Sequence, residues 1–84
     1  MENKELEFMQ FLVKDTDDKI SQLEMEKNEA LIGFGSNDVS DMIEDECSRK
    51  QRDVVREAWN LAIDRGCNAS TVERVFTEEF EYYL

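Results

Sequence analysis

The chain of 84 residues contains no proline, and its three glycines all lie at the edges of stretches with helical periodicity. Proline breaks a helix and an interior glycine costs roughly 1 kcal/mol, so these stretches are free to form long, uninterrupted helices. A high content of Glu, Leu, Lys and Arg favours the same structure. The sequence therefore predicts one all-α domain over residues 1–84. Two long antiparallel helices are expected near residues 3–32 and 37–65, with a shorter C-terminal helix near 71–83.

The predicted first helix carries apolar side chains at alternating steps of three and four residues. This stripe consists of Leu6, Met9, Val13, Ile20 and Leu23, with Thr16, Lys27 and Ala30 completing the spacing. Such a pattern is typical of a coiled-coil seam. It leaves two interpretations open: the helix packs on its own chain, or two copies pair along the seam. The second interpretation predicts a homodimer.

The acidic segment Asp15-Thr16-Asp17-Asp18 lies in the middle of this helix. Asp and Thr side chains favour helix caps, so a break into two shorter helices is the alternative to the continuous helix that we expect. Asp15, Asp17 and Glu26 also have the spacing of three ligands in an EF-hand calcium loop. However, Lys19 stands where an oxygen ligand belongs and Ile20 where the loop needs glycine, so no calcium site is expected.

Glycine and capping residues mark the ends of the first two predicted helices. We expect Gly33 to adopt the left-handed conformation that ends the first helix, with Phe34 folded back against the corner. Ser36 or Asn37 is then expected to cap the second helix, because their side chains can accept hydrogen bonds from its first amides. Gly66 is expected to end the second helix in the left-handed conformation.

The third helix is predicted to begin at Ser70-Thr71-Val72-Glu73, which has the form of a capping box with Ser70 as the cap. Its C-terminal part is unusually aromatic and contains Phe76, Phe80, Tyr82 and Tyr83. Two interpretations are open for these side chains. They pack on Trp59 and the first helix, or they form an exposed surface on which a partner docks.

The net charge of −11 is unevenly distributed along the chain. Residues 1–46 carry −10, residues 47–76 carry +2, and residues 77–84 carry −3. A strongly negative protein repels phosphates at long range, so we do not expect nucleic acid as a partner. The same charge favours a protein partner with a basic surface.

Several kinds of chemistry lack the residues that they need. The chain has no histidine, so the commonest general base and the usual partner of a nucleophilic Ser or Cys are missing. Cys47 and Cys67 do not have metal-ligand spacing. We therefore expect no enzyme, no cofactor and no metal. No apolar run of about 18 residues is present that would cross a membrane. The N-terminal MENKELEF does not resemble a signal peptide, so we expect a cytoplasmic protein with reduced cysteines.

Residues 58–76, AWNLAIDRGCNASTVERVF, resemble the helix-turn-helix of bacterial repressors. The matching features are Leu61 and Ala62 in the first helix, Gly66 at the turn, and Val72 and Val75 on the second helix. The resemblance implies that the second helix lies in the DNA major groove. It implies DNA contacts for Ser70, Thr71 and Arg74, and a backbone contact for Arg65. The sequence departs from the family at Arg65, where an apolar residue is usual, and by acids that phosphates would repel, namely Glu73, Glu78 and Glu79.

These features predict a small acidic regulatory protein that acts by protein–protein interaction, as an adaptor or inhibitor. In size, acidity and lack of motifs it resembles the regulators that phages and other mobile elements encode. One alternative is a helix-turn-helix DNA-binding regulator. Another is a DNA mimic, whose carboxylates imitate phosphates and inhibit a nucleic-acid-binding protein. A purely structural assembly subunit is the remaining alternative.

Overall fold

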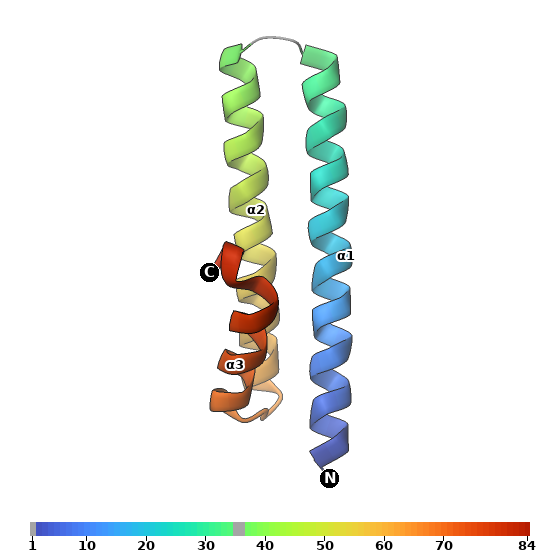
Figure 1. Ribbon diagram of the computed structural model, residues 1–84, viewed down its shortest axis with the longest axis vertical. Helices are drawn as coiled ribbons and strands as arrows, with labels where there is room; N and C mark the ends of the chain where they lie inside the picture. The colour runs from blue at the N-terminus through green and yellow to red at the C-terminus, as the bar shows by residue number, and fades with distance from the viewer. Residues whose placement is uncertain (1, 35–36) are drawn as a thin grey trace.

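The fold is an antiparallel helical hairpin with a third helix folded back against one half of it (Figure 1). The structure, a computed structural model, describes residues 2–34 and 37–84, and side chains for residues 4–33 and 39–84. Helix α1 spans Glu2–Phe34, α2 spans Asn37–Asp64 and α3 spans Ala69–Phe80, followed by a 3-10 turn, η1, at Glu81–Tyr83. The predicted all-α architecture is confirmed, and the molecule measures 52 × 19 × 17 Å.

Helix α1 is continuous through the acidic segment at which a break was the alternative. Thr16 lies on the inner face with 1% of its surface exposed, so it occupies a position of the apolar stripe and does not cap a helix. Asp15 pairs with Lys19 one turn later, at 3.1 Å between Oδ2 and Nζ, on the solvent side. Such a pair supports a helix by roughly 0.2–0.5 kcal/mol. Thr16 on the buried face and Asp15 on the solvent face are therefore both compatible with a continuous helix.

The apolar stripe of α1 packs against the chain itself. Met9, Leu12 and Ile20 of α1 are buried, and the core is completed by Val55, Ala58 and Ala62 of α2 and by Val72, Phe76 and Phe80 of α3. Of the proposed dimer seam, Met9 and Ile20 are thus buried, Val13 and Leu23 are partly buried, and Leu6 is 47% exposed. The first interpretation of the stripe accounts for these contacts, and the homodimer stays a prediction.

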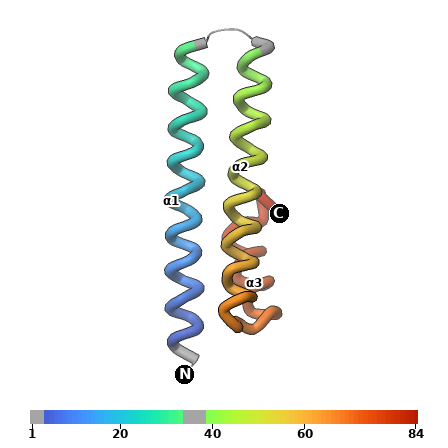
Figure 2. Tube along the Cα trace, turned by 180° about the vertical axis from the view of Figure 1, so that it is seen from behind, coloured from blue at the N-terminus to red at the C-terminus, as the bar shows by residue number. Residues whose placement is uncertain are grey.

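The core lies in the half of the hairpin that holds the start of α1 and the end of α2, where α3 lies against α2 (Figures 1 and 2) and also contacts α1. Trp59 and Phe76 are in contact, with ring centroids 5.9 Å apart, and Phe76 and Phe80 are 5.6 Å apart. Phe76 and Phe80 are 0% and 1% exposed. They belong to the core, as the packing interpretation expects, and their side chains are not available as partner contacts.

The helix ends match the prediction at Gly66 and differ from it at Gly33 and at the start of α3. The predicted cap of α2 at Ser36 or Asn37 lies outside the described side chains. Gly66 has a φ of 88°, and the amides of Gly66 and Cys67 donate to Ile63 O and Ala62 O at 3.0 and 3.1 Å. This is the Schellman arrangement that a left-handed glycine permits. The prediction for Gly33 is wrong, because α1 continues through it to Phe34. The side chain of Phe34 and the residues Gly35 and Ser36 lie outside the described part of the chain.

The start of α3 lies two residues before the predicted start. Asn68, not Ser70, caps the helix, and its Oδ1 accepts a hydrogen bond from the Thr71 amide at 3.2 Å. The Asn68 amide in turn donates to the Glu5 carboxylate, which joins the turn to α1. The sequence prediction named only Ser70, although Asn is also a residue type that favours the cap position. Asn68 has the extended backbone conformation of an N-cap, with φ −63° and ψ 122°.

Candidate functional site

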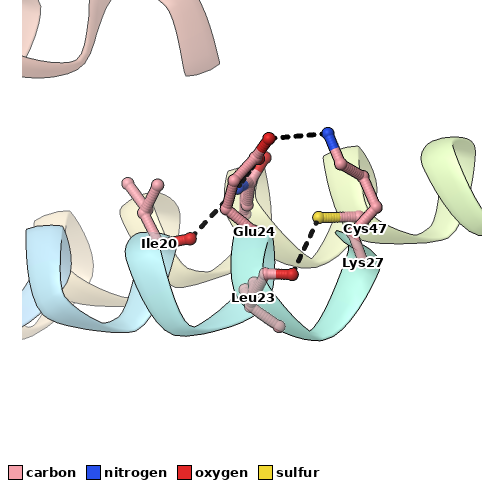
Figure 3. Close-up of polar contacts among 6 residues, drawn as sticks. Ile20, Leu23, Glu24, Lys27 and Cys47 are labelled. Carbon is pink, nitrogen blue, oxygen red and sulfur yellow. Dashed lines mark hydrogen bonds and ion pairs between the residues drawn. The ribbon is translucent and has the colours of Figure 1, made fainter. Parts of the chain in front are cut away.

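Beyond α3 the hairpin continues as two helices alone, and a group of polar contacts holds them together where the core ends (Figure 3). We call Glu24, Lys27, Cys47 and Gln51 the polar clamp. Gln51 is 5% exposed, and its Nε2 donates to Ile20 O at 3.2 Å and to Glu24 Oε2 at 3.3 Å. The Cys47 thiol donates to Leu23 O at 3.4 Å. The clamp thus ties side chains of α2 to the backbone of α1.

The clamp changes the ionisation of its own members. Hydrogen bonds from Lys27 and from Gln51 lower the pKa of Glu24, and the bond to Glu24 raises the pKa of Lys27. Burial and the Glu24 charge raise the pKa of the Cys47 thiol above its ordinary 9.0. Burial and the Glu5 charge likewise raise the pKa of Cys67. Both cysteines are free thiols that stay protonated at neutral pH, which makes them poor nucleophiles.

A hollow of about 540 Å³ lies where the C-terminal segment meets α2. We call it the C-terminal hollow, and it is lined by Arg52, Arg56, Trp59, Asn60, Tyr82, Tyr83 and Leu84. The four α2 residues share one helical face, since Arg52, Arg56 and Asn60 follow at steps of four and Trp59 lies three residues after Arg56. Tyr82 and Tyr83 of η1, together with Leu84, supply the other wall. Phe80 is anchored in the core, and η1 then turns the last residues toward α2.

Aromatic rings line the C-terminal hollow without being fully buried. Tyr82 is 89% exposed, and its ring meets that of Tyr83 edge-on with centroids 5.2 Å apart. Tyr83 is partly buried, and burial together with the Glu24 charge raises the pKa of its hydroxyl. Trp59 is partly buried and held from behind by Phe76. The hollow therefore offers one exposed ring and two partly buried rings.

The charge of the C-terminal hollow differs from that of the surrounding surface. Arg52 and Arg56 line it, and no Asp or Glu side chain does. Four other hollows in the described part of the chain each include at least one acid in their lining. The side chains of Arg52 and Arg56 are exposed, and neither forms an ion pair with a described residue. In a chain of charge −11, this hollow is thus lined by two basic side chains and by no acidic one.

The residues of the helix-turn-helix alternative lie apart from this hollow. The Arg65 guanidinium stacks over the Phe8 ring at 5.8 Å from its centroid, so it serves the contact between the turn and α1. Ser70 and Arg74 are exposed, and Thr71 is partly buried. Helix α3 runs back alongside α2 (Figures 1 and 2), whereas the two helices of the DNA-binding motif meet at about 90–120°. The resemblance thus extends to the glycine turn and not to the helix arrangement.

The structure also bears on metals and membranes. Within residues 2–34 and 37–84, no group of three or more His, Cys, Asp or Glu side chains is arranged to hold a metal ion. Among the same residues, no helix has the length and apolar character needed to span a membrane.

Sequence reasoning named Tyr82 and Tyr83 as candidate partner contacts, and both line the C-terminal hollow. It did not name Arg52 or Arg56 as contacts, and they entered only through the charge of +2 on residues 47–76. A signal was present, because Arg52, Arg56 and Trp59 follow one another at helical steps of four and three. In the sequence alone, this spacing is also that of a solvent-exposed helix face. Only the structure shows that the C-terminal segment lies beside these three residues.

The chain was compared with protein-family models, with curated proteins and with solved structures. None of the three comparisons found a match. Function is therefore inferred from the chemistry of the residues and from their placement.

Proposed function

We propose that this chain is a small regulatory protein that acts by binding another protein, and that the C-terminal hollow is its principal contact. The observation that supports the proposal is the lining of the hollow by Arg52, Arg56, Trp59, Tyr82 and Tyr83. Trp, Tyr and Arg are the residue types that dominate the binding energy of protein interfaces. Their concentration in one concave site favours an interaction surface over a purely structural face.

The arrangement of the hollow suits a partner side chain. Trp59 is held by Phe76, so little conformational entropy is lost when a partner contacts it. Tyr82 is almost fully exposed and gains most from being covered. Burial of such a ring against an apolar partner contributes on the order of 1.5–3 kcal/mol. The hollow thus combines a partly buried ring that packs on the core with an exposed ring that a partner can cover.

The acidic remainder of the chain would select among partners. Residues 1–46 carry a charge of −10, which repels nucleic acids and other polyanions at long range and attracts proteins with a basic surface. Such a field mainly changes the association rate, while the contacts in the hollow determine the dissociation rate. A partner that is basic overall is therefore favoured. This division of roles fits an adaptor or inhibitor.

A capture experiment with matched variants tests the proposal. Tagged wild-type chain, Tyr82→Ala and Phe11→Ala are used as baits in nuclease-treated lysate of the source cells. Phe11 is the control because it is an aromatic residue, 62% exposed, that lies outside the hollow. We expect one protein to be captured by wild type and Phe11→Ala, and to be reduced about ten-fold or more by Tyr82→Ala.

Other results would favour other functions. Capture that is identical for all three baits would show that the hollow is not the contact. Binding of duplex DNA that Arg74→Ala weakens would favour the helix-turn-helix alternative. Capture of a nucleic-acid enzyme that DNA displaces, independently of Tyr82, would favour the DNA mimic.

A further inference from the structure

We propose that the C-terminal hollow binds an acidic side chain of the partner, between Arg52 and Arg56, together with a neighbouring apolar or aromatic side chain. The inference rests on the proposed function and specifies the ligand of the same site. It means that the partner, though basic overall, presents a local acidic anchor. The expectation from composition alone concerned only the partner's basic surface.

The two guanidinium groups provide the recognition of the acid. Arg52 and Arg56 are one helical turn apart on α2, so their Cβ atoms are about 5–6 Å apart and both side chains leave the same face. A guanidinium presents parallel N–H donors that match the two oxygens of a carboxylate. Neither arginine is committed to an ion pair with a described residue of this chain. Both are therefore ready to bind an external carboxylate.

The rings provide the second half of the recognition. Trp59 forms a floor beside the arginines, and Tyr82 stands at the rim. A partner residue next to the acid would cover these rings and exclude water from the arginine pair. Exclusion of water strengthens a charge-assisted hydrogen bond, because the effective dielectric constant falls. An acid alone would bind weakly at so open a site, so the ligand needs both parts.

A phosphate ligand, such as a nucleotide, fits the site less well. Phosphate sites commonly use the free amides at a helix N-terminus or a glycine-rich loop. The starts of α2 and α3 both lie away from the C-terminal segment (Figure 1), and no glycine lines the hollow. The charge of −11 also opposes polyanions more than a single carboxylate. An acidic peptide segment is therefore the favoured ligand.

Trp59 is the only tryptophan of the chain, so its fluorescence reports directly on the hollow. The probe is an array of 12-residue peptides with a fixed central Glu-Phe pair and randomised flanks. Matched arrays carry Gln-Phe and Glu-Ser. We expect the Glu-Phe array to bind best. Its strongest peptide should change Trp59 emission on titration, and its Glu→Gln form should bind about ten-fold or more weakly.

Variants of the chain complete the test. Arg52→Gln with Arg56→Gln should weaken the peptide about ten-fold or more, whereas Arg74→Gln, an exposed arginine outside the hollow, should not. Circular dichroism checks that each variant remains helical. Equal binding to the Glu-Phe and Gln-Phe arrays would overturn the inference. A change in Trp59 emission caused by adenosine diphosphate and not by the peptides would also overturn it.

The inference and the proposed function can fail separately. If Tyr82→Ala loses the captured protein but Arg52→Gln with Arg56→Gln does not, the interaction surface stands and the acidic ligand is wrong. If the peptide binds as expected but capture does not depend on Tyr82, the acid site stands and its role in partner binding is wrong.

Discussion

Gln51 is a buried polar residue at the point where the apolar core gives way to the two-helix part of the hairpin. Its amide donates to the backbone of Ile20 and to Glu24. Replacement by Met keeps a similar volume and removes both bonds, so we expect a loss of about 1–2 kcal/mol of unfolding free energy. Urea unfolding would show a lower midpoint at unchanged slope. Gln22→Met is the control, because Gln22 is exposed. A midpoint equal to that of wild type would show that the clamp is not stabilising.

Glu24 makes the stability of the clamp depend on pH. Its pKa is lowered from the ordinary 4.5 by hydrogen bonds from Lys27 and Gln51. A carboxyl whose folded pKa lies below its unfolded value stabilises the fold above the unfolded value. That contribution is lost as the pH falls from about 4.5 through the folded pKa. We therefore expect Glu24→Gln to be less stable than wild type at pH 6, and the difference to shrink toward pH 3.

The comparison needs a control for the general effect of removing a negative charge. Glu29→Gln is the control, because Glu29 is an exposed acid of the same helix. Its side chain makes no hydrogen bond to a described residue. Unfolding midpoints of the three proteins between pH 3 and pH 6 provide the measurement. If wild type and Glu24→Gln differ by a constant amount across this range, the proposed role of Glu24 is refuted.

At the scale of elements, the cap of α3 is Asn68 and not the predicted Ser70. Asn68 accepts a hydrogen bond from the Thr71 amide, and the exposed Ser70 lies inside the helix. Asn68→Ala should therefore cost about 1 kcal/mol. Ser70→Ala should be neutral or slightly stabilising, because Ala is the better helix former. Thermal unfolding of the two variants measures this, and the opposite order would restore Ser70 as the cap.

Substitution of two glycines by Ala provides a second test of element boundaries. The two substitutions are expected to change the stability of the fold in opposite directions. Gly66 has a φ of 88°, and a Cβ there would meet nothing within 4 Å, so Gly66→Ala pays only the backbone cost of roughly 1 kcal/mol. Gly33 lies inside α1 and its Cβ would also meet nothing within 4 Å. Gly33→Ala should thus stabilise by roughly 0.5–1 kcal/mol. Destabilisation by both substitutions would mean that α1 ends at Gly33.

Features that depend on local sequence signals could be predicted, whereas features that depend on tertiary contacts could not. The three helices and the Gly66 turn follow from periodicity, capping and the lack of proline. Whether Met9 and Ile20 face α2 or a second copy could not be predicted, because a heptad stripe does not specify its partner. The C-terminal hollow depends on the contact of Phe80 with the core, which brings Tyr82 to Arg56. That contact joins distant parts of the chain and leaves no local pattern.

At the scale of the whole molecule, burial is concentrated at one end. The core and α3 occupy the half of the hairpin that holds Met9 and Ala62. We call the other half, residues 24–33 and 39–46, the arm. None of the arm's described side chains is fully buried, and Ile32 and Met42 are 86% and 71% exposed. Apolar burial is the main source of stability, so the arm should open locally at lower free energy than the core half.

Amide hydrogen exchange tests this asymmetry. We expect peptides from the arm to exchange at least about ten-fold faster than peptides from residues 9–20 and 55–62, under conditions where the chain remains folded. Equal protection of the two halves, in a sample that sedimentation shows to be a monomer of 9.9 kDa, would contradict the expectation.

The same experiment tests the homodimer. Met9 and Ile20 are already covered within the chain, so a second copy would gain most by covering the arm. Arm protection that increases with protein concentration would therefore show pairing, through a surface other than the α1 seam.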